Sequence, residues 1–98
     1  MYEREAMIDE VIEKFNFERV HLAMLALDWQ WLTENKDGHE VPTIVRLKSM
    51  ARHLLRNAIK HGTTGSGGFV AKYHPKSDED PEYFQLQFIL TESDSYDD

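Results

Sequence analysis

Five histidines are the first side chains of this 98-residue sequence that suggest chemistry, because imidazole is a common metal ligand. His53 and His61 are eight residues apart on one predicted helix. That spacing is about 12 Å along the helix axis, too far for both rings to reach one ion through bonds of about 2 Å. The sequence has no cysteine and no HExxH motif. His61 with His74 remains as an alternative pair, but we expect no metal site.

Nucleophilic catalysis would need a hydroxyl beside an oriented base. Candidate hydroxyls are those of Ser49, Thr63, Thr64 and Ser66, and none of them lies in a nucleophile-elbow pattern. Asp9 and Glu13 are paired carboxylates on a predicted wet helix face, where they are solvated and not tuned for acid–base catalysis. A small domain also leaves little concave surface. We therefore expect a protein that is not an enzyme and that uses no cofactor.

The element that must position most of the cations is the stretch from Thr43 to His61, which we predict to be one amphipathic helix. Its apolar residues recur at steps of three and four and so share one buried face; they are Ile44, Leu47, Ala51, Leu54 and Ala58, widened by Met50, Leu55 and Ile59. The opposite face is basic and carries Arg46, Lys48, Arg52, His53, Arg56, Lys60 and His61. Thr43 is expected to cap the start of this helix and Gly62 to end it.

The charges are segregated along the chain. Residues 1–40 carry −6, residues 41–77 carry +7 and residues 78–98 carry −8, within a net charge of −7. Either the acidic flanks neutralise the basic helix within the fold, or the basic face is an anion site. Direct nucleic-acid binding is disfavoured because the acidic flanks would repel phosphates. An acidic surface that faces a basic partner fits this charge pattern better.

Two short motifs suggest a ligand site beside the basic helix. The run GTTGSGG, residues 62–68, lacks the Lys-Ser/Thr of a phosphate-binding P-loop and leads from helix to strand, so we predict a helix stop at Gly62 and a flexible connector over residues 63–68. Its small residues would still let backbone amides approach a ligand. Trp29 and Trp31 would project about 200° apart on a helix, so both cannot enter one core. An exposed Trp near Arg52 or Arg56 could stack on a base or anchor a protein interface.

The remaining elements follow from periodicity and turn residues. Glu3 to Phe15 is predicted to be a first helix, and Asn16 is expected to cap a second helix from Phe17 to about Trp31 that is either separate from the first or kinked against it. Apolar residues surround the second helix, which is therefore predicted to be the central and most buried one. The charged N-terminus and the absence of an apolar run of about 20 residues predict a soluble, cytoplasmic protein without a signal peptide or membrane span.

Alternating apolar residues near the C-terminus predict two strands joined by the loop PKSDEDPE. In the first strand Phe69, Ala71 and Tyr73 alternate with Val70, Lys72 and His74, and in the second strand Phe84, Leu86, Phe88 and Leu90 form one strongly apolar face. The predicted fold class is α+β, with three helices followed by an antiparallel hairpin that packs on the helices or extends across a homodimer. Residues 1–91 are expected to form one domain and residues 92–98 a disordered acidic tail.

Several short motifs in chain order resemble those of small bacteriophage and prophage proteins of unassigned role. They are W-x-W (Trp29, Trp31), V-P-T (Val41 to Thr43), LL (Leu54, Leu55), GGF (Gly67 to Phe69) and LQFIL. The resemblance covers most of the chain from Phe17 to Thr91 and brings no catalytic residues with it. It implies an accessory role in infection, such as disabling a host defence as anti-CRISPR proteins do, or sequestering a signalling nucleotide.

The preferred hypothesis is a stoichiometric inhibitor in the host cytoplasm whose acidic surface occludes a basic site on a host protein. Its expected contact residues are Glu5, Asp9, Glu10, Glu13, Asp78, Glu79 and Asp80. The alternative is a small-molecule sponge for a linear or cyclic nucleotide. Its expected ligand residues are Trp29, Trp31, Arg52, Arg56, Lys60, Gly65, Ser66 and Gly67. A minor structural component of the virion is a third hypothesis.

Overall fold

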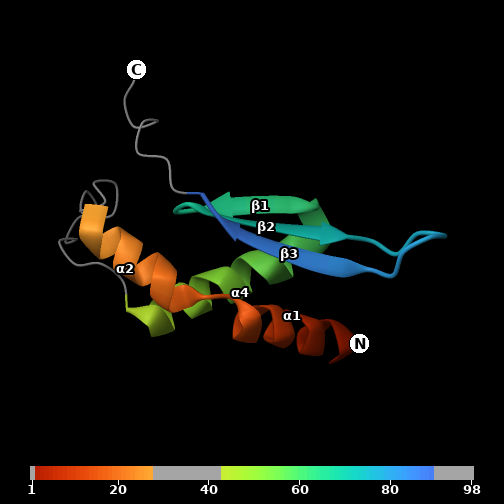
Figure 1. The fold of residues 1–98 in the computed structure, drawn as a ribbon. Helices are drawn as coiled ribbons and strands as arrows, with labels where there is room; N and C mark the ends of the chain where they lie inside the picture. Colours follow the sequence, from red (N-terminus) through yellow and green to blue (C-terminus); the bar gives the residue numbers. More distant parts are fainter. Residues whose placement is uncertain (1, 28–42, 90–98) are drawn as a thin grey trace, which may run out of the picture.

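The computed structural model describes residues 2–27 and 43–89, which form three helices and a three-stranded antiparallel sheet. The helices are α1 (Tyr2–Lys14), α2 (Phe17–Leu27) and α4 (Ile44–His61), and the strands are β1 (Thr63–Ser66), β2 (Phe69–His74) and β3 (Tyr83–Phe88). The helices lie on one face of the sheet, as Figure 1 shows. The predicted α+β class is thereby confirmed.

Helix α4 lies at the centre of this arrangement and contacts all three strands and both other helices. Its buried residues are those of the predicted stripe, Leu47, Ala51, Leu54, Leu55 and Ala58. The Thr43 side chain accepts a hydrogen bond from the Arg46 N–H at 3.2 Å, which caps the helix as predicted. Gly62 ends it at φ 83°, where the absence of a Cβ removes the usual steric penalty.

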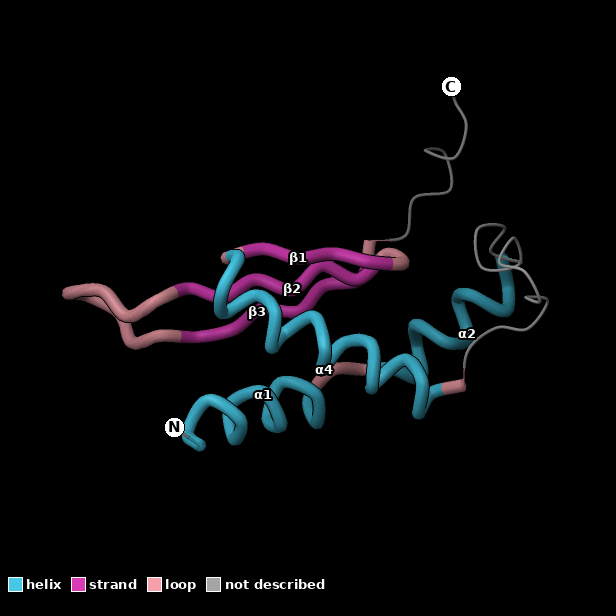
Figure 2. Tube along the Cα trace, turned by 180° about the vertical axis from the view of Figure 1, so that it is seen from behind, coloured by secondary structure: helices cyan, strands magenta, loops and turns pink. Residues whose placement is uncertain are grey.

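Helices α1 and α2 are separated at Asn16, as the sequence predicts. The Asn16 side chain accepts a hydrogen bond from the Arg19 N–H at 3.0 Å, so this residue caps α2. The prediction that α2 is the most buried helix is wrong: Leu22 is 63% exposed and Leu25 52% exposed. The reason is visible in Figures 1 and 2, where α2 projects beyond the end of the sheet and meets α4 along one side only.

The sheet has the order β1-β2-β3, and its two C-terminal strands form the predicted hairpin. The register of β2 and β3 pairs Phe69 with Phe88 and Ala71 with Leu86, so the apolar face predicted for β3 continues onto β2. The flexible connector predicted at residues 63–68 is wrong, because Thr63–Ser66 forms a third strand paired with β2. Gly67 and Gly68 form the two-residue turn between β1 and β2, at φ 58° and 93°, values that glycine adopts readily.

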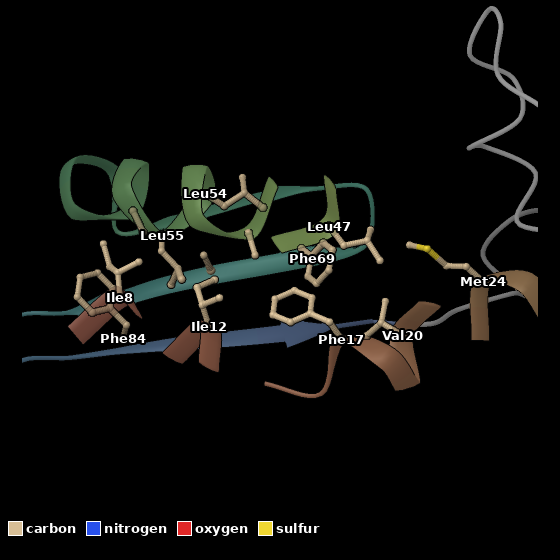
Figure 3. Close-up of a cluster of buried hydrophobic side chains, with 13 residues drawn as sticks. Ile8, Ile12, Phe17, Val20, Met24, Leu47, Leu54, Leu55, Phe69 and Phe84 are labelled. Carbon is tan, nitrogen blue, oxygen red and sulfur yellow. The ribbon is translucent and has the colours of Figure 1, made fainter. Parts of the chain in front are cut away.

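The core lies between the sheet and the helices (Figure 3). Its centre is Phe69, which has no exposed surface and whose ring centroid lies 5.9 Å from that of Phe17 and 5.1 Å from that of Phe88. Ile8 and Ile12 of α1 close the other end against Phe84 and α4. This core holds α1, α4 and the sheet at fixed positions, which sets where the charged side chains of α4 can reach.

Several predictions concern residues outside the described ranges. Trp29 and Trp31, the end of the second predicted helix and the acidic tail at 92–98 are among them. Within residues 2–27 and 43–89, no helix combines the length and hydrophobicity that a membrane span requires.

Candidate functional site

The cations of α4 lie on two different sides of that helix. Arg52 and Arg56 are four residues apart and reach α1; we call these two residues the paired flank. Arg46, His53 and Lys60 recur every seven residues, which is two helical turns, and so lie along one line. With Ser49 they form what we call the open flank, which lies next to β1. The single basic face predicted from the sequence is therefore divided by its neighbours.

On the paired flank, each arginine meets a carboxylate of α1. Arg56 donates two hydrogen bonds to Glu5, from Nε to Oε2 at 3.0 Å and from Nη2 to Oε1 at 2.9 Å. This is the two-pronged geometry that suits a planar guanidinium. Arg52 pairs through Nη1 with the Asp9 carboxylate one turn further along α1. The spacing of four residues in both helices brings the two pairs into register.

The pair formed by Arg56 and Glu5 alters the pKa of both groups. The hydrogen bond from Arg56 is the main cause that lowers the pKa of Glu5, and the same bond raises the pKa of Arg56. Both side chains remain about half exposed, so solvent and salt screen the attraction. The flank is electrically satisfied in the folded protein and offers little uncompensated charge to a ligand.

On the open flank, the structure contains a hollow of about 320 Å³. It is lined by Arg46, Ser49, Met50, His53, Leu54 and Ser66. Ser66 ends β1 just before the Gly67–Gly68 turn, so the wall opposite α4 comes from the strand that sequence analysis missed. The hollow combines two basic side chains, two hydroxyls and two apolar side chains. Within residues 2–27 and 43–89, no carboxylate lines it or pairs with Arg46 or His53.

Among the residues of the predicted nucleotide site that the structure describes, only Ser66 lines this hollow; Trp29 and Trp31 lie outside the described ranges. Arg52 and Arg56 are bound to α1 instead, and Lys60 lies further along the open flank. Gly65 lies within β1, where a Cβ would come within 3.2 Å of the Phe69 carbonyl oxygen. Arg46, Ser49 and His53, which line the hollow, were not among the predicted site residues. Their spacing of three and then four residues places them on one side of a helix and was a usable signal.

The acids predicted to contact a partner differ in their surroundings. Glu5 and Asp9 are engaged with α4, and Glu10 pairs with Lys14 at 3.0 Å on its own helix. The loop acids Asp78, Glu79 and Asp80 are exposed, and no ion pair within the described residues involves them. Figures 1 and 2 show this β2–β3 loop projecting past the start of α1.

The loop that carries these acids is organised by Ser77. The Ser77 N–H donates to the Asp80 carbonyl oxygen at 2.8 Å, and Ser77 Oγ accepts from the N–H groups of Asp80 and Glu79 at 3.1 and 3.3 Å. All three bonds use the backbone of the acidic residues, so their carboxylates remain available on the outside of the turn. The loop therefore presents three negative charges in a defined arrangement.

A second charged cluster, which the sequence did not suggest, joins α1 to the hairpin. Arg4 donates from Nε to Glu82 at 3.2 Å and from Nη2 to the Tyr73 hydroxyl at 3.2 Å, and that hydroxyl donates to Glu82. The hydrogen bond from Tyr73 is the main cause that lowers the pKa of Glu82, and the same bond raises the pKa of Tyr73. The cluster fixes the base of the acidic loop against α1.

No family model, curated protein or solved structure matches this chain. In the part of the chain that the structure describes, no three His, Asp or Glu side chains are grouped so that they could share a metal ion. The arrangement defines an α+β domain with two charged surfaces of opposite sign: the projecting acidic loop and the open flank of α4. Both surfaces suit binding through charge, and they lie on different elements.

Proposed function

We propose that this protein acts by stoichiometric binding, and that its acidic loop occludes a basic site on another protein. The supporting observation is the loop itself: Asp78, Glu79 and Asp80 are exposed on a projecting turn that Ser77 organises. An ordered group of like charges lowers the cost of ordering on binding and steers a positively charged partner. The resemblance to phage accessory proteins suggests that the partner is a component of a bacterial host defence system.

The α1 acids are a less suitable test of this proposal than the loop acids. Reversing the charge of Glu5 and Asp9 would also break their contacts with α4, so a loss of binding could reflect damage to the fold. Replacing Asp78, Glu79 and Asp80 by Asn, Gln and Asn removes three charges but keeps the backbone bonds to Ser77. A control replaces the exposed Glu3 and Glu18 by Gln, which removes acidic charge from α1 and α2 at positions outside the predicted contact residues.

The experiment measures phage plating on defended bacteria that express either form, together with capture of the inhibited host component by the purified protein. The proposal predicts that the unaltered protein and the Glu3/Glu18 control protect the phage and retain the component at one-to-one stoichiometry. The loop variant should lose both effects. Retention of the host component by the unaltered protein should also fall as ionic strength rises from about 0.1 M to about 1 M, because the Debye length shortens from about 10 Å to about 3 Å. Full protection by the loop variant would contradict the proposal.

A further inference from the structure

From the open flank of α4 we infer that the hollow between α4 and β1 is a binding site for a small organic phosphate, a phosphomonoester whose apolar portion lies on Met50 and Leu54. This site is separate from the acidic loop of the proposed function. The first supporting observation is that the basic side chains of the hollow have no acidic partner among the described residues. Arg46 and His53 face one hollow, and within the described ranges 2–27 and 43–89 no acid compensates them. Elsewhere on the same helix, Arg52 and Arg56 are both compensated.

The hydrogen-bonding groups of the hollow favour phosphate over smaller anions. A phosphomonoester presents three terminal oxygens and up to two negative charges. Arg46 can donate two parallel bonds to two of these oxygens, and the ring of His53 can donate to the third. Ser49 and Ser66 add hydroxyl donors from opposite walls. A carboxylate has one charge and two oxygens, so it would leave part of this donor set without a partner.

The size and the apolar wall indicate that the ligand is more than an inorganic ion. A volume of about 320 Å³ is at the lower end of the range of small-molecule sites, about 300 to 1,000 Å³, and exceeds what a phosphate ion needs. Met50 and Leu54 line the remaining space, and Met is a flexible side chain that adapts to varied apolar groups. An organic group on the ester oxygen would cover this wall.

The wall formed by β1 is held firmly enough to define the site. The Thr64 hydroxyl donates to the Leu54 carbonyl oxygen at 2.9 Å, which ties the middle of β1 to α4 beside the hollow. Ser66 then pairs with Phe69, the fully buried centre of the core. A site whose walls are already in position needs less ordering when the ligand binds.

The test is a calorimetric titration of the full chain with phenyl phosphate, inorganic phosphate and benzoate. Phenyl phosphate should bind one site per chain with a dissociation constant on the order of 0.1 to 1 mM, because the hollow is open to screening solvent. Inorganic phosphate should bind about tenfold more weakly, because it has no apolar group to contact Met50 and Leu54. Benzoate should also bind about tenfold more weakly, because it forms fewer charge-assisted hydrogen bonds.

Variants test whether the binding uses this hollow. Arg46→Gln should weaken phenyl phosphate binding at least about tenfold, since it removes a charged donor pair. Lys48→Gln is the matched control, because it removes one positive charge from the same helix outside the hollow, and it should change binding less than about twofold. Ser49→Leu keeps every charge but fills the hollow, and it should abolish binding. Circular dichroism checks that each variant is folded.

Three results would overturn the inference. The first is the absence of saturable binding of phenyl phosphate at about ten times the largest expected dissociation constant. The second is an equal loss of affinity in Arg46→Gln and Lys48→Gln, which would show attraction to the overall charge of the helix. The third is binding of benzoate or inorganic phosphate as tight as that of phenyl phosphate, which would refute the assigned ligand class.

Discussion

The two flanks of α4 carry similar cations but have opposite roles in the structure, and the difference comes from the neighbouring element. Beside the paired flank lies α1, whose Glu5 and Asp9 match Arg56 and Arg52 in spacing. Beside the open flank lies β1, a Thr-Thr-Gly-Ser strand without charge. A density of positive charge in the sequence therefore does not define a site. What defines it is whether the packing supplies a counter-charge.

The largest expected effect is on the free energy of unfolding, and it compares two leucines of α4. Leu55 is fully buried, whereas Leu54 lines the open hollow. Leu55→Ala should lower the free energy of unfolding by about 2 to 5 kcal/mol. Leu54→Ala should cost about 1 kcal/mol less, because water can enter the enlarged hollow and no closed cavity forms. Urea unfolding followed by circular dichroism measures both, and an equal or greater loss for Leu54→Ala would contradict an open hollow.

The next effect tests whether β1 depends on its backbone geometry. Gly68 lies at φ 93°, and an added Cβ would come within 2.7 Å of Phe88 Cε1. Gly68→Ala should therefore cost about 2 kcal/mol or more through strain and displacement of the ring. Gly62→Ala is the control at the other end of β1, where φ is 83° but a Cβ meets nothing within 4 Å. Gly62→Ala should lower the free energy of unfolding by about 1 kcal/mol. Thermal unfolding in which Gly62→Ala is less stable than Gly68→Ala would contradict the steric role of Gly68 in the turn.

A smaller effect concerns the bond that ties β1 to α4. Thr64→Val keeps the shape of the side chain but removes the hydroxyl that donates to the Leu54 carbonyl. The expected cost is about 1 kcal/mol in the free energy of unfolding. Thr63→Val is the matched control, because Thr63 is exposed at the neighbouring position of the same strand, and it should be close to neutral. If both variants unfold at the same urea concentration, the bond does not stabilise the open flank.

The smallest effect belongs to the paired flank and depends on pH. The pKa of Glu5 in the folded protein lies below its ordinary value of 4.5, chiefly because Arg56 donates hydrogen bonds to it. Its stabilising contribution is therefore present above pH 4.5 and is lost as the pH falls through the folded pKa. Glu5→Gln should therefore be less stable than the unaltered protein above pH 4.5, and the two stability curves should converge as the pH falls below the folded pKa of Glu5, which makes the acid limb of the variant shallower. Glu13→Gln, on the exposed side of α1, should leave the profile unchanged.

Features encoded by neighbouring residues were predictable from the sequence. The spacing of Leu47, Ala51, Leu54 and Ala58, with Thr43 and Gly62 at the ends, defines α4 almost to the residue. The alternation around Phe69 and Phe84 likewise defines the hairpin and its buried face. In both cases the signal is local, and the tertiary packing agrees with it.

Features that depend on distant contacts were not predictable. Gly65 and the Gly67–Gly68 turn that follows hide the strand character of Thr63–Ser66, and pairing with β2 outweighs that weak local preference. The apolar composition of α2 could not show that this helix extends past the sheet and leaves Leu22 exposed. The contact of Arg4 with Glu82 joins residues 78 positions apart, and nothing local announces it. The hollow was missed for the same reason, since its far wall is β1.

The most direct test of the contrast between the two flanks is a nuclear magnetic resonance titration that follows the arginine side-chain N–H signals while phenyl phosphate is added. The account predicts that the Nε–H signal of Arg46 shifts and saturates with a single dissociation constant. The signals of Arg52 and Arg56 should stay in place, because Asp9 and Glu5 already hold these side chains. Movement of the Arg52 or Arg56 signals with an unchanged Arg46 signal would contradict the central claim that packing against α1 closes one flank and leaves the other open.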